Sequence, residues 1–257
     1  MTTHVVYFSA TYTTRTICEQ IAGHLSEDIV TYDVTNDESL EEVLTPEEDL
    51  LVIGIPVYAG RIPEMAVERL NRFKGKGTKA IAVAVYGNRD YEDALIELTD
   101  LVQANGFQVI GAGAFIARHC IFTELAATRP DAQGREVIRH FAEQCRAIMQ
   151  SPTTGLPMIE VKGNRPYKPN GHAAARPTSD DTCNHCGKCA RLCPTHAISL
   201  DNPPQTDNTL CLACGRCLVV CPTGSRKFRG EKYEEMAAKF VAAFSARREP
   251  ELFFAMA

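Results

Sequence analysis

Eight of the eleven cysteines belong to two copies of one sequence motif, CxxCxxCxxxCP, and each copy is here called a cysteine phrase. They are Cys183, Cys186, Cys189 and Cys193, followed by Pro194, and Cys211, Cys214, Cys217 and Cys221, followed by Pro222. Two-residue gaps let three successive thiolates surround one face of a compact inorganic core, while the fourth cysteine points away from it. The repeat therefore predicts two cubane [4Fe–4S] clusters.

The fourth cysteine of each phrase is expected to cross over, because in the bacterial two-cluster pattern it binds the cluster of the other phrase. The predicted ligand sets are Cys183, Cys186, Cys189 and Cys221 for the first cluster, and Cys211, Cys214, Cys217 and Cys193 for the second. Structural zinc also uses CxxC pairs but normally takes two well-separated ones. Disulfides would explain neither the spacing nor its repeat. The stretch 181–225 resembles a bacterial dicluster ferredoxin.

The overall composition limits the classes of partner. The chain has 257 residues and a formal net charge of −5, enough length for one large domain and a small one. Each oxidised cluster with its thiolates adds roughly −2, so nucleic acid is not expected as a partner. The start of the chain has no basic leader pattern, and we expect no membrane span. Free thiols and oxygen-sensitive clusters favour a cytoplasmic, oxygen-poor setting.

Residues 1–150 alternate short apolar runs with longer amphipathic stretches, which is typical of a parallel sheet covered by helices. Strands are expected at 4–8, 29–33, 49–54, 79–86 and 107–115, and helices at 13–26, 63–73, 91–104 and 136–150, with a weaker one at 37–44. The pattern predicts an α/β fold, a doubly wound sheet of five parallel strands in the order 2-1-3-4-5.

Three further segments follow this domain. Residues 151–180 are rich in proline and glycine and form a linker, which we expect to lie against the protein and help dock the next module. Its charges, Lys162, Arg165, Lys168 and Arg176, either offset nearby negative groups or are ordinary solvated side chains. Residues 181–226 are predicted to be a small α+β domain, and 227–257 a C-terminal helix whose apolar stripe serves packing.

Ligands of doubly wound sheets bind beyond the carboxyl ends of the strands, which directs attention to the loops there. After the first strand, small hydroxyl residues open directly into a helix: Ser9, Thr11, Thr13 and Thr14. Backbone N–H groups at a helix start, with these hydroxyls, form a neutral cradle for a phosphate. The absence of a lysine distinguishes the loop from a nucleotide-triphosphate P-loop. An ordinary Ser/Thr capping cluster is the alternative.

The next two strands run into loops that combine tyrosine with glycine, PVYAGRIP and YGNRDYEDAL. Aromatic walls and backbone donors are what a planar ring needs. With these segments the chain resembles flavodoxin-like proteins, and more closely the fusions in which a flavodoxin-like domain precedes two CxxCxxCxxxCP motifs.

The resemblance implies an FMN site. Ser9, Thr11, Thr13 and Thr14 would hold the phosphate; Pro56, Val57, Tyr58, Ala59 and Gly60 would line one side of the ring, and Tyr86, Gly87, Asn88, Arg89 and Tyr91 the other. Tyr12 departs from the pattern, because flavodoxin phosphate loops commonly have glycine there. It must either adopt a backbone conformation allowed to tyrosine or turn outward and cover the ligand, and the alternative is a domain that has lost FMN.

His119 and Cys120 follow the fifth strand at the same sheet edge. Reduced flavin takes up protons, so His119 is a candidate proton donor, although a lone histidine is more often a local hydrogen-bonding residue. Cys18 and Cys145 fall in helical patterns and are expected to pack as small apolar groups.

Clusters exchange single electrons and flavin takes one or two, so the predicted function is electron transfer between two [4Fe–4S] clusters and FMN. The acceptor is either a small oxidant, which would make the protein an FMN-dependent oxidoreductase, or a partner protein, which would make it a carrier. The chain has no GxGxxG after a strand, so direct input from a nicotinamide is not expected. The sequence is compatible with a monomer and with a homodimer.

Overall fold

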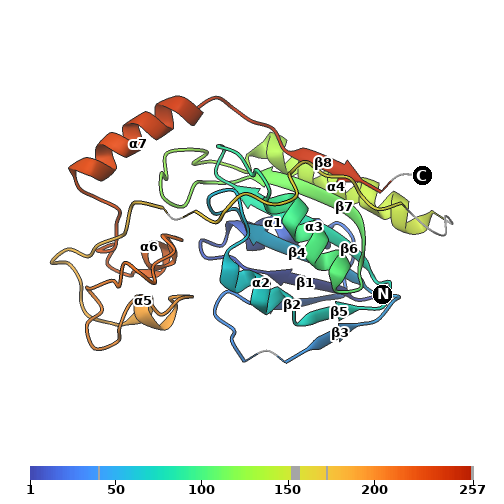
Figure 1. The fold of residues 1–257 in the computed structure, drawn as a ribbon, viewed down its shortest axis with the longest axis horizontal. Coiled ribbons are helices and arrows are strands. Elements are labelled where there is room, and N and C mark those ends of the chain that lie inside the picture. The colour runs from blue at the N-terminus through green and yellow to red at the C-terminus, as the bar shows by residue number, and fades with distance from the viewer. Residues whose placement is uncertain (40, 152–156, 172, 256–257) are drawn as a thin grey trace.

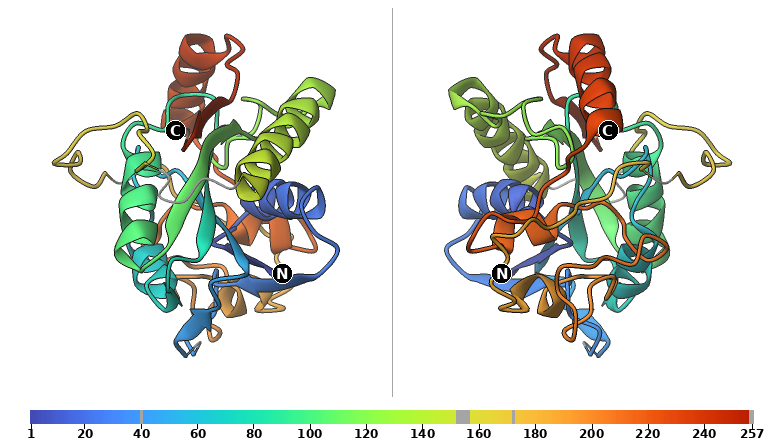
Figure 2. Two further views of the ribbon diagram at one scale, coloured as in Figure 1. Left: turned by 90° about the vertical axis from the view of Figure 1, so that its right-hand side faces the viewer. Right: turned by 90° about the vertical axis from the view of Figure 1, so that its left-hand side faces the viewer.

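The computed structural model describes residues 1–39, 41–151, 157–171 and 173–255. One large sheet lies between helices on both of its faces, and a smaller, mostly irregular module sits at one end of it (Figures 1 and 2). The N-terminus and the end of the described chain both lie at the opposite end from that module (Figure 1).

The large sheet has six strands in the order β2-β1-β4-β6-β7-β8. They are β1 (Thr3–Tyr7), β2 (Ile29–Asp33), β4 (Leu50–Pro56), β6 (Lys79–Tyr86), β7 (Gln108–Ile116) and β8 (Glu251–Phe254). The first five are parallel, and their arrangement confirms the predicted 2-1-3-4-5 order. Residues of β4 are all buried, as expected for a central strand with both faces covered.

The sixth strand corrects the prediction of a purely parallel sheet and of a C-terminal region that is only a helix. β8 pairs antiparallel with β7, so that Phe254 lies opposite Gly111 and Leu252 opposite Gly113. The apolar side chains of β8 therefore cover the edge strand β7, whose glycines offer little side chain of their own. Because of this pairing the sheet edge is the short strand β8 and not the nine-residue strand β7.

Helices α1 (Thr13–Gly23) and α4 (Ala132–Gln150) pack on one face of the sheet, and α2 (Glu64–Leu70) and α3 (Ala94–Ala104) on the other (Figure 2). Each face has its own apolar core. Cys18 and Cys145 are fully buried in the core beneath α1 and α4, as predicted. The weaker helix expected at 37–44 is wrong: residue 40 lies outside the described residues, and β3 (Val43–Thr45) pairs with β5 (Phe73–Gly75) in a small parallel sheet.

The small module contains α5 (Lys188–Arg191) and α6 (Arg216–Val220), and one of these helices lies in each cysteine phrase. Among residues 181–226, all of them described, there is no strand, so the α+β expectation is corrected to two short helices joined by loops. An isolated bridge joins Thr178 to Lys227 and closes the module's base. From there α7 (Glu231–Phe244) carries the chain back to the large sheet (Figure 1).

The linker lies along α3 and the loop before it, as expected. Asp93 accepts hydrogen bonds from the backbone N–H groups of Asn164 (2.9 Å) and Lys168 (2.7 Å). Arg165 pairs with Asp100 at 2.5 Å. The side chains of Arg165 and Lys168 thus pair with carboxylates of the large domain and not with the cysteine sets. Arg176 instead donates to the carbonyl of Asn208 inside the small module.

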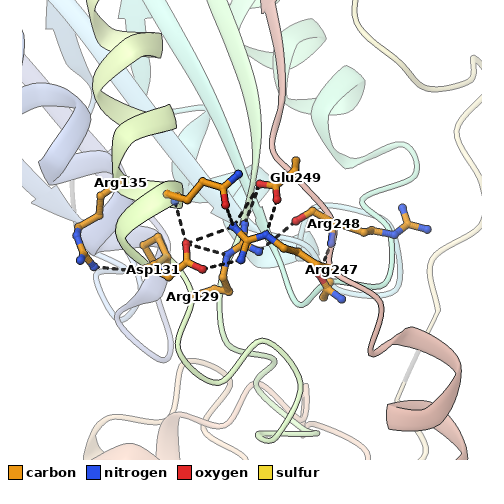
Figure 3. A network of polar contacts seen from close by, with 10 residues as sticks. Arg129, Asp131, Arg135, Arg247, Arg248 and Glu249 are labelled. Atoms are coloured by element: carbon orange, nitrogen blue, oxygen red, sulfur yellow. Dashed lines mark hydrogen bonds and ion pairs between the residues drawn. The ribbon is translucent and has the colours of Figure 1, made fainter.

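A second set of polar contacts fastens the segment that follows α7 (Figure 3). Asp131 caps α4 by accepting from Gly134 N–H at 2.9 Å, and its other oxygen pairs with Arg247 at 2.6 Å. Arg129, whose side chain is buried, donates to the carbonyl of Arg248 at 3.2 Å. One carboxylate thus fixes both a helix start and the approach to β8. Within the described residues, no helix is long and apolar enough to cross a membrane.

A substitution at Gly111 tests the close packing of α4 on β7. A Cβ atom there would lie 2.5 Å from the Cys145 sulfur. Gly111→Ala should therefore cost about 1–3 kcal/mol of stability and lower Tm by several degrees. Because Cys145→Ala removes the clashing atom, the double variant should lose less than the two single variants together. Thermal unfolding followed by circular dichroism measures all three; a strictly additive loss would contradict the contact.

Candidate electron-transfer site

A cavity of about 510 Å³ opens at the carboxyl ends of the parallel strands. Nine residues predicted to hold flavin line it: Thr11, Thr13, Pro56, Val57, Tyr58, Ala59, Tyr86, Gly87 and Arg89. Its volume suits a ligand of nucleotide size. The structure thus brings the three loops together at the sheet edge where the sequence placed them.

The first loop offers unpaired donors at the start of α1. Its N-cap residue, Tyr12, makes no side-chain capping hydrogen bond. Ser9 is buried behind the loop, where its hydroxyl accepts from Arg15 N–H at 3.0 Å. The buried hydroxyl of Thr14 has no hydrogen-bond partner. Because Ser9 already accepts the Arg15 N–H, the N–H groups ahead of it in the first turn and the unsatisfied Thr14 hydroxyl are the donors that fit a phosphate.

Tyr12 does not adopt an ordinary backbone conformation, so the first of the two expected options is wrong. Its φ of 67° lies in the left-handed region, where glycine is favoured and other residues pay roughly 1 kcal/mol. The ring is partly exposed and lies under the guanidinium of Arg216, whose carbon is 4.7 Å from the ring centre. Tyr12 therefore keeps the loop shape that glycine gives elsewhere, and a residue of the small module covers it.

The second loop is shaped by a buried ion pair. Arg61 binds Glu97 through two contacts, of 2.7 and 2.8 Å, and the same carboxylate accepts the backbone N–H of Ile62 at 3.1 Å. Gly60 has a φ of 83° and lies so close to Glu92 that a Cβ there would overlap its carboxylate. Gly60 and Arg61 thus fix the path of the loop, and Pro56 to Ala59 supply its cavity surface.

Asn88 and Tyr91 are placed differently from the prediction and do not line the cavity. Asn88 donates to the carbonyls of Phe244 (2.7 Å) and Ala246 (2.8 Å) at the end of α7. Tyr91 is fully buried and donates to Glu251 of β8 at 2.7 Å. Both residues attach the C-terminal segment, a contact that no local pattern in their own loop signals.

His119 lines the cavity as a neutral imidazole. Its Nδ1 accepts the backbone N–H groups of Ile121 and Phe122, each at 3.1 Å, so the ring proton must sit on Nε2. Burial, with a further contribution from the charge of Arg89, lowers the pKa of His119 to about 4. Of the two ring nitrogens, Nε2 is the one that can donate a proton. Burial also raises the pKa of Cys120 to about 12, so this cavity residue stays a thiol.

The thiols of the first predicted ligand set gather at one place. Cys183, Cys186, Cys189 and Cys221 line the same small pocket, with Arg226 beside them. Burial would raise the pKa of Cys221, but hydrogen bonds from the Thr223 hydroxyl and from backbone N–H groups at 223, 225 and 226 lower it to about 7. Four soft thiols with amide donors suit an iron–sulfur cluster, whose potential such bonds tune.

The second set gathers beside the first. Cys193 packs with Cys217 and Cys211 of the other phrase in one apolar cluster, which also contains Cys189 of the first set. Burial raises the pKa of Cys217 to about 12, so its thiol gives up a proton when it binds metal. Within the described residues, the side chains do not converge into a closed metal cage. The crossed assignment is supported by neighbourhood and remains a prediction.

Several cavity residues were not predicted from the sequence. Cys211, Leu212 and Ala213, at the start of the second phrase, form part of the wall. Linker residues Ala173, Ala174 and Ala175 form another part, and Met236 and Phe240 of α7 a third. Phe240 stacks on Phe122 with ring centres 4.4 Å apart. The apolar stripe of α7 does serve packing, but it packs around this cavity.

Comparison with known proteins agrees with this geometry. A model of the flavodoxin family, described as "Flavodoxin", matches residues 5–134, half of the chain. The chain belongs to the flavodoxin family. A second model, "4Fe-4S dicluster domain", matches residues 182–225. The protein is therefore a fusion of a flavodoxin domain with a dicluster ferredoxin module, and its cofactors are FMN and two [4Fe–4S] clusters.

Solved flavodoxins resemble the first domain of the fusion. A flavodoxin from the domain Archaea is 14% identical, with a TM-score of 0.40, and the match covers 58% of this chain and 100% of that one. A Fusobacterium nucleatum flavodoxin bound to flavin mononucleotide is 16% identical, with a TM-score of 0.42, and the match covers 57% of this chain and 97% of the other. A search of curated proteins returned no match.

The state of His119 gives a prediction about pH. Its lowered pKa means that the ring stays neutral as pH falls from 8 to 5.5, a range in which a free imidazole gains its proton. Histidine ¹⁵N NMR should show one pyridine-like and one pyrrole-like nitrogen throughout, assigned by the signal lost in His119→Gln. Protonation with a midpoint near 6.5 would contradict the buried, doubly hydrogen-bonded ring.

Proposed function

We propose that the protein carries electrons between a protein partner and FMN through its two clusters in a fixed order, with the second cluster next to the flavin. The observation that carries this order is that Cys211, Leu212 and Ala213 form part of the flavin cavity wall. Cys186 of the first set is instead exposed to solvent. The first cluster therefore faces the partner, and the second faces FMN.

Tyr58 fills the space between the flavin site and the second set. It lines the cavity and packs against the same apolar core as Cys214. Burial, with the neighbouring thiols of Cys214 and Cys120, raises the pKa of Tyr58 well above its usual value. Its side chain packs at this junction and stays a neutral phenol. A packed contact keeps the two cofactor sites close, which short-range electron transfer between bound cofactors requires.

The two cofactor types supply complementary chemistry when bound: clusters exchange one electron at a time, and flavin accepts one or two. The chain holds them at fixed separation by several contacts between its domains. Buried Arg69 donates from the flavodoxin domain to the carbonyl of Pro194 at 3.2 Å. Cys120 of the cavity contacts the carbonyl of Ala213 at 3.9 Å. Free thiols such as Cys18 and Cys145 support a cytoplasmic site of action.

Exposed Cys186 favours a small ferredoxin-type protein as the donor, since a partner can approach the first set at this residue without entering the cavity. For the acceptor, two candidates follow from the cavity. The wall formed by the linker and α7 favours a small oxidant admitted beside FMN, which makes the protein an FMN-dependent oxidoreductase. A carrier that passes electrons on to a partner protein is the second candidate. Turnover with quinones or free flavins, compared with protein acceptors, separates the two.

Removal of one cluster at a time tests the order. In anaerobic protein, Cys186→Ser should leave about four of eight irons and block flavin reduction by a reduced ferredoxin-type protein, because the partner-facing cluster is lost. Cys211→Ser should also keep about four irons, yet its first cluster should still be reduced at once while flavin reduction lags. Stopped-flow absorbance of cluster and flavin distinguishes these results. Prompt reduction of the remaining cluster in Cys186→Ser, or its absence in Cys211→Ser, would overturn the proposed order.

The same assay tests the crossed ligation. Cys221→Ser should behave like Cys186→Ser, although it lies in the second phrase, because it is predicted to serve the first cluster. Cys193→Ser should behave like Cys211→Ser for the converse reason. If each variant instead behaves like the other members of its own phrase, each phrase binds its own cluster and the crossed assignment is wrong.

A further inference from the structure

The two cysteine phrases carry a basic residue at the same position, Lys188 in the sequence Cys-Gly-Lys-Cys and Arg216 in Cys-Gly-Arg-Cys. The glycine before each takes a left-handed conformation, with φ values of 68° and 77°, so the local backbone is the same in both copies. The surroundings differ completely. Lys188 is exposed, whereas Arg216 is only 6% exposed.

Arg216 is buried because the second phrase packs on the phosphate loop of the flavodoxin domain. A Cβ at Gly215 would lie 3.2 Å from the Thr11 methyl group and 3.1 Å from the Cys120 carbonyl oxygen. From this position the Arg216 guanidinium donates to the Ala10 carbonyl at 3.3 Å and covers the Tyr12 ring. Arg216 therefore contacts two residues, Ala10 and Tyr12, of the loop that precedes α1.

The hydrogen-bonding capacity of Arg216 is not used up. Its Nε is buried and has no partner among the described residues. A buried guanidinium is costly without an anion nearby, and a single carbonyl does not balance its charge. The side chain of Arg15, on the first turn of α1, is committed to Glu19 at 2.8 Å. The loop thus has an N-cap residue, Tyr12, without a side-chain capping bond, the unpaired Thr14 hydroxyl and one buried guanidinium from the other domain.

We propose that Arg216 of the ferredoxin module is a binding residue for the FMN phosphate, so that the flavin site is completed by the domain that holds the clusters. This deepens the proposed function and rests on it. A phosphate dianion supplies the charge that the buried guanidinium lacks. Since Arg216 lies between Cys214 and Cys217, the same contact fixes the second cluster segment against the flavin cavity.

The test compares two flavins that differ in the phosphate alone, FMN and riboflavin. Their dissociation constants are measured by fluorescence quenching on cluster-loaded, flavin-free protein, and the ratio is compared between variants. Arg216→Met keeps an unbranched stem over Tyr12 and removes the charge, and Arg216→Lys keeps a charge. The control is Lys188→Met, which replaces the basic residue at the equivalent position of the first phrase. Iron content confirms that each protein carries its clusters.

In the wild-type protein FMN should bind more tightly than riboflavin. Arg216→Met should weaken FMN by roughly 10- to 100-fold, the usual effect of losing a hydrogen bond to a charged group, and change riboflavin affinity by less than about 3-fold. Arg216→Lys should fall between Met and wild type, and Lys188→Met should leave both affinities unchanged. Because the ratio is taken within one preparation, partial loss of folded protein does not alter it.

Equal weakening of both flavins in Arg216→Met, or loss of all flavin binding, would overturn the proposal and leave Arg216 as a contact between domains. An unchanged FMN affinity would also overturn it. Failure of the wild-type protein to bind either flavin is a different result, because it would remove the proposed function itself.

Discussion

The close packing of the second cysteine phrase on the carboxyl edge of the sheet is the contact on which the rest of this structure depends. A doubly wound sheet gathers the loops that follow its strands at one edge, and in this protein a second domain forms one wall of the cavity at that edge. The close approach of Gly215 to Thr11 and to the Cys120 carbonyl contributes to this, because a Cβ at Gly215 would lie 3.2 and 3.1 Å from these atoms, closer than ordinary van der Waals contact. Through that contact two cofactor sites share one boundary.

The chain is routed so that this contact is held from several directions. The linker crosses α3 through Asp93, and α7 returns from the module to add β8 to the large sheet. Asn88 and Tyr91, beside the flavin loops, both bind this returning segment. The small module is thus tied to the flavodoxin domain at its entry and at its exit, which limits how far it can move away from the cavity.

Buried arginine side chains stabilise both the interface between the domains and the small module itself. Arg69 and Arg216 each reach a backbone carbonyl of the other domain, and Arg226 joins the loops of the module beneath the first cysteine set through Thr206 at 2.5 Å. Planar guanidinium groups suit this role because they offer five donors in a fixed geometry. Burial raises the pKa of the neighbouring Cys211 and Cys217 thiols, but the charge of Arg226 lowers it and so favours the thiolates that metal binding needs.

The amino-acid sequence alone determined the features that depend on local spacing. The cysteine phrases specified two clusters, the alternation of apolar runs specified five parallel strands and their order, and the hydroxyl and tyrosine loops specified where FMN would lie. Each of these follows from residues close together in the chain, whose chemistry or periodicity is visible without knowing the fold.

The tertiary structure decided which distant segments meet. Short β8 has only four residues and gains its stability from pairing with β7, so its own sequence gave no strong strand signal. Asn88 and Tyr91 looked like flavin residues because they sit in a flavin loop, yet their partners lie about 160 residues away. Lys188 and Arg216 occupy equivalent places in a repeat, and only the packing of one copy on the flavodoxin domain makes them different. Long-range contacts carry no local pattern, because they are set by the whole shape of the folded chain.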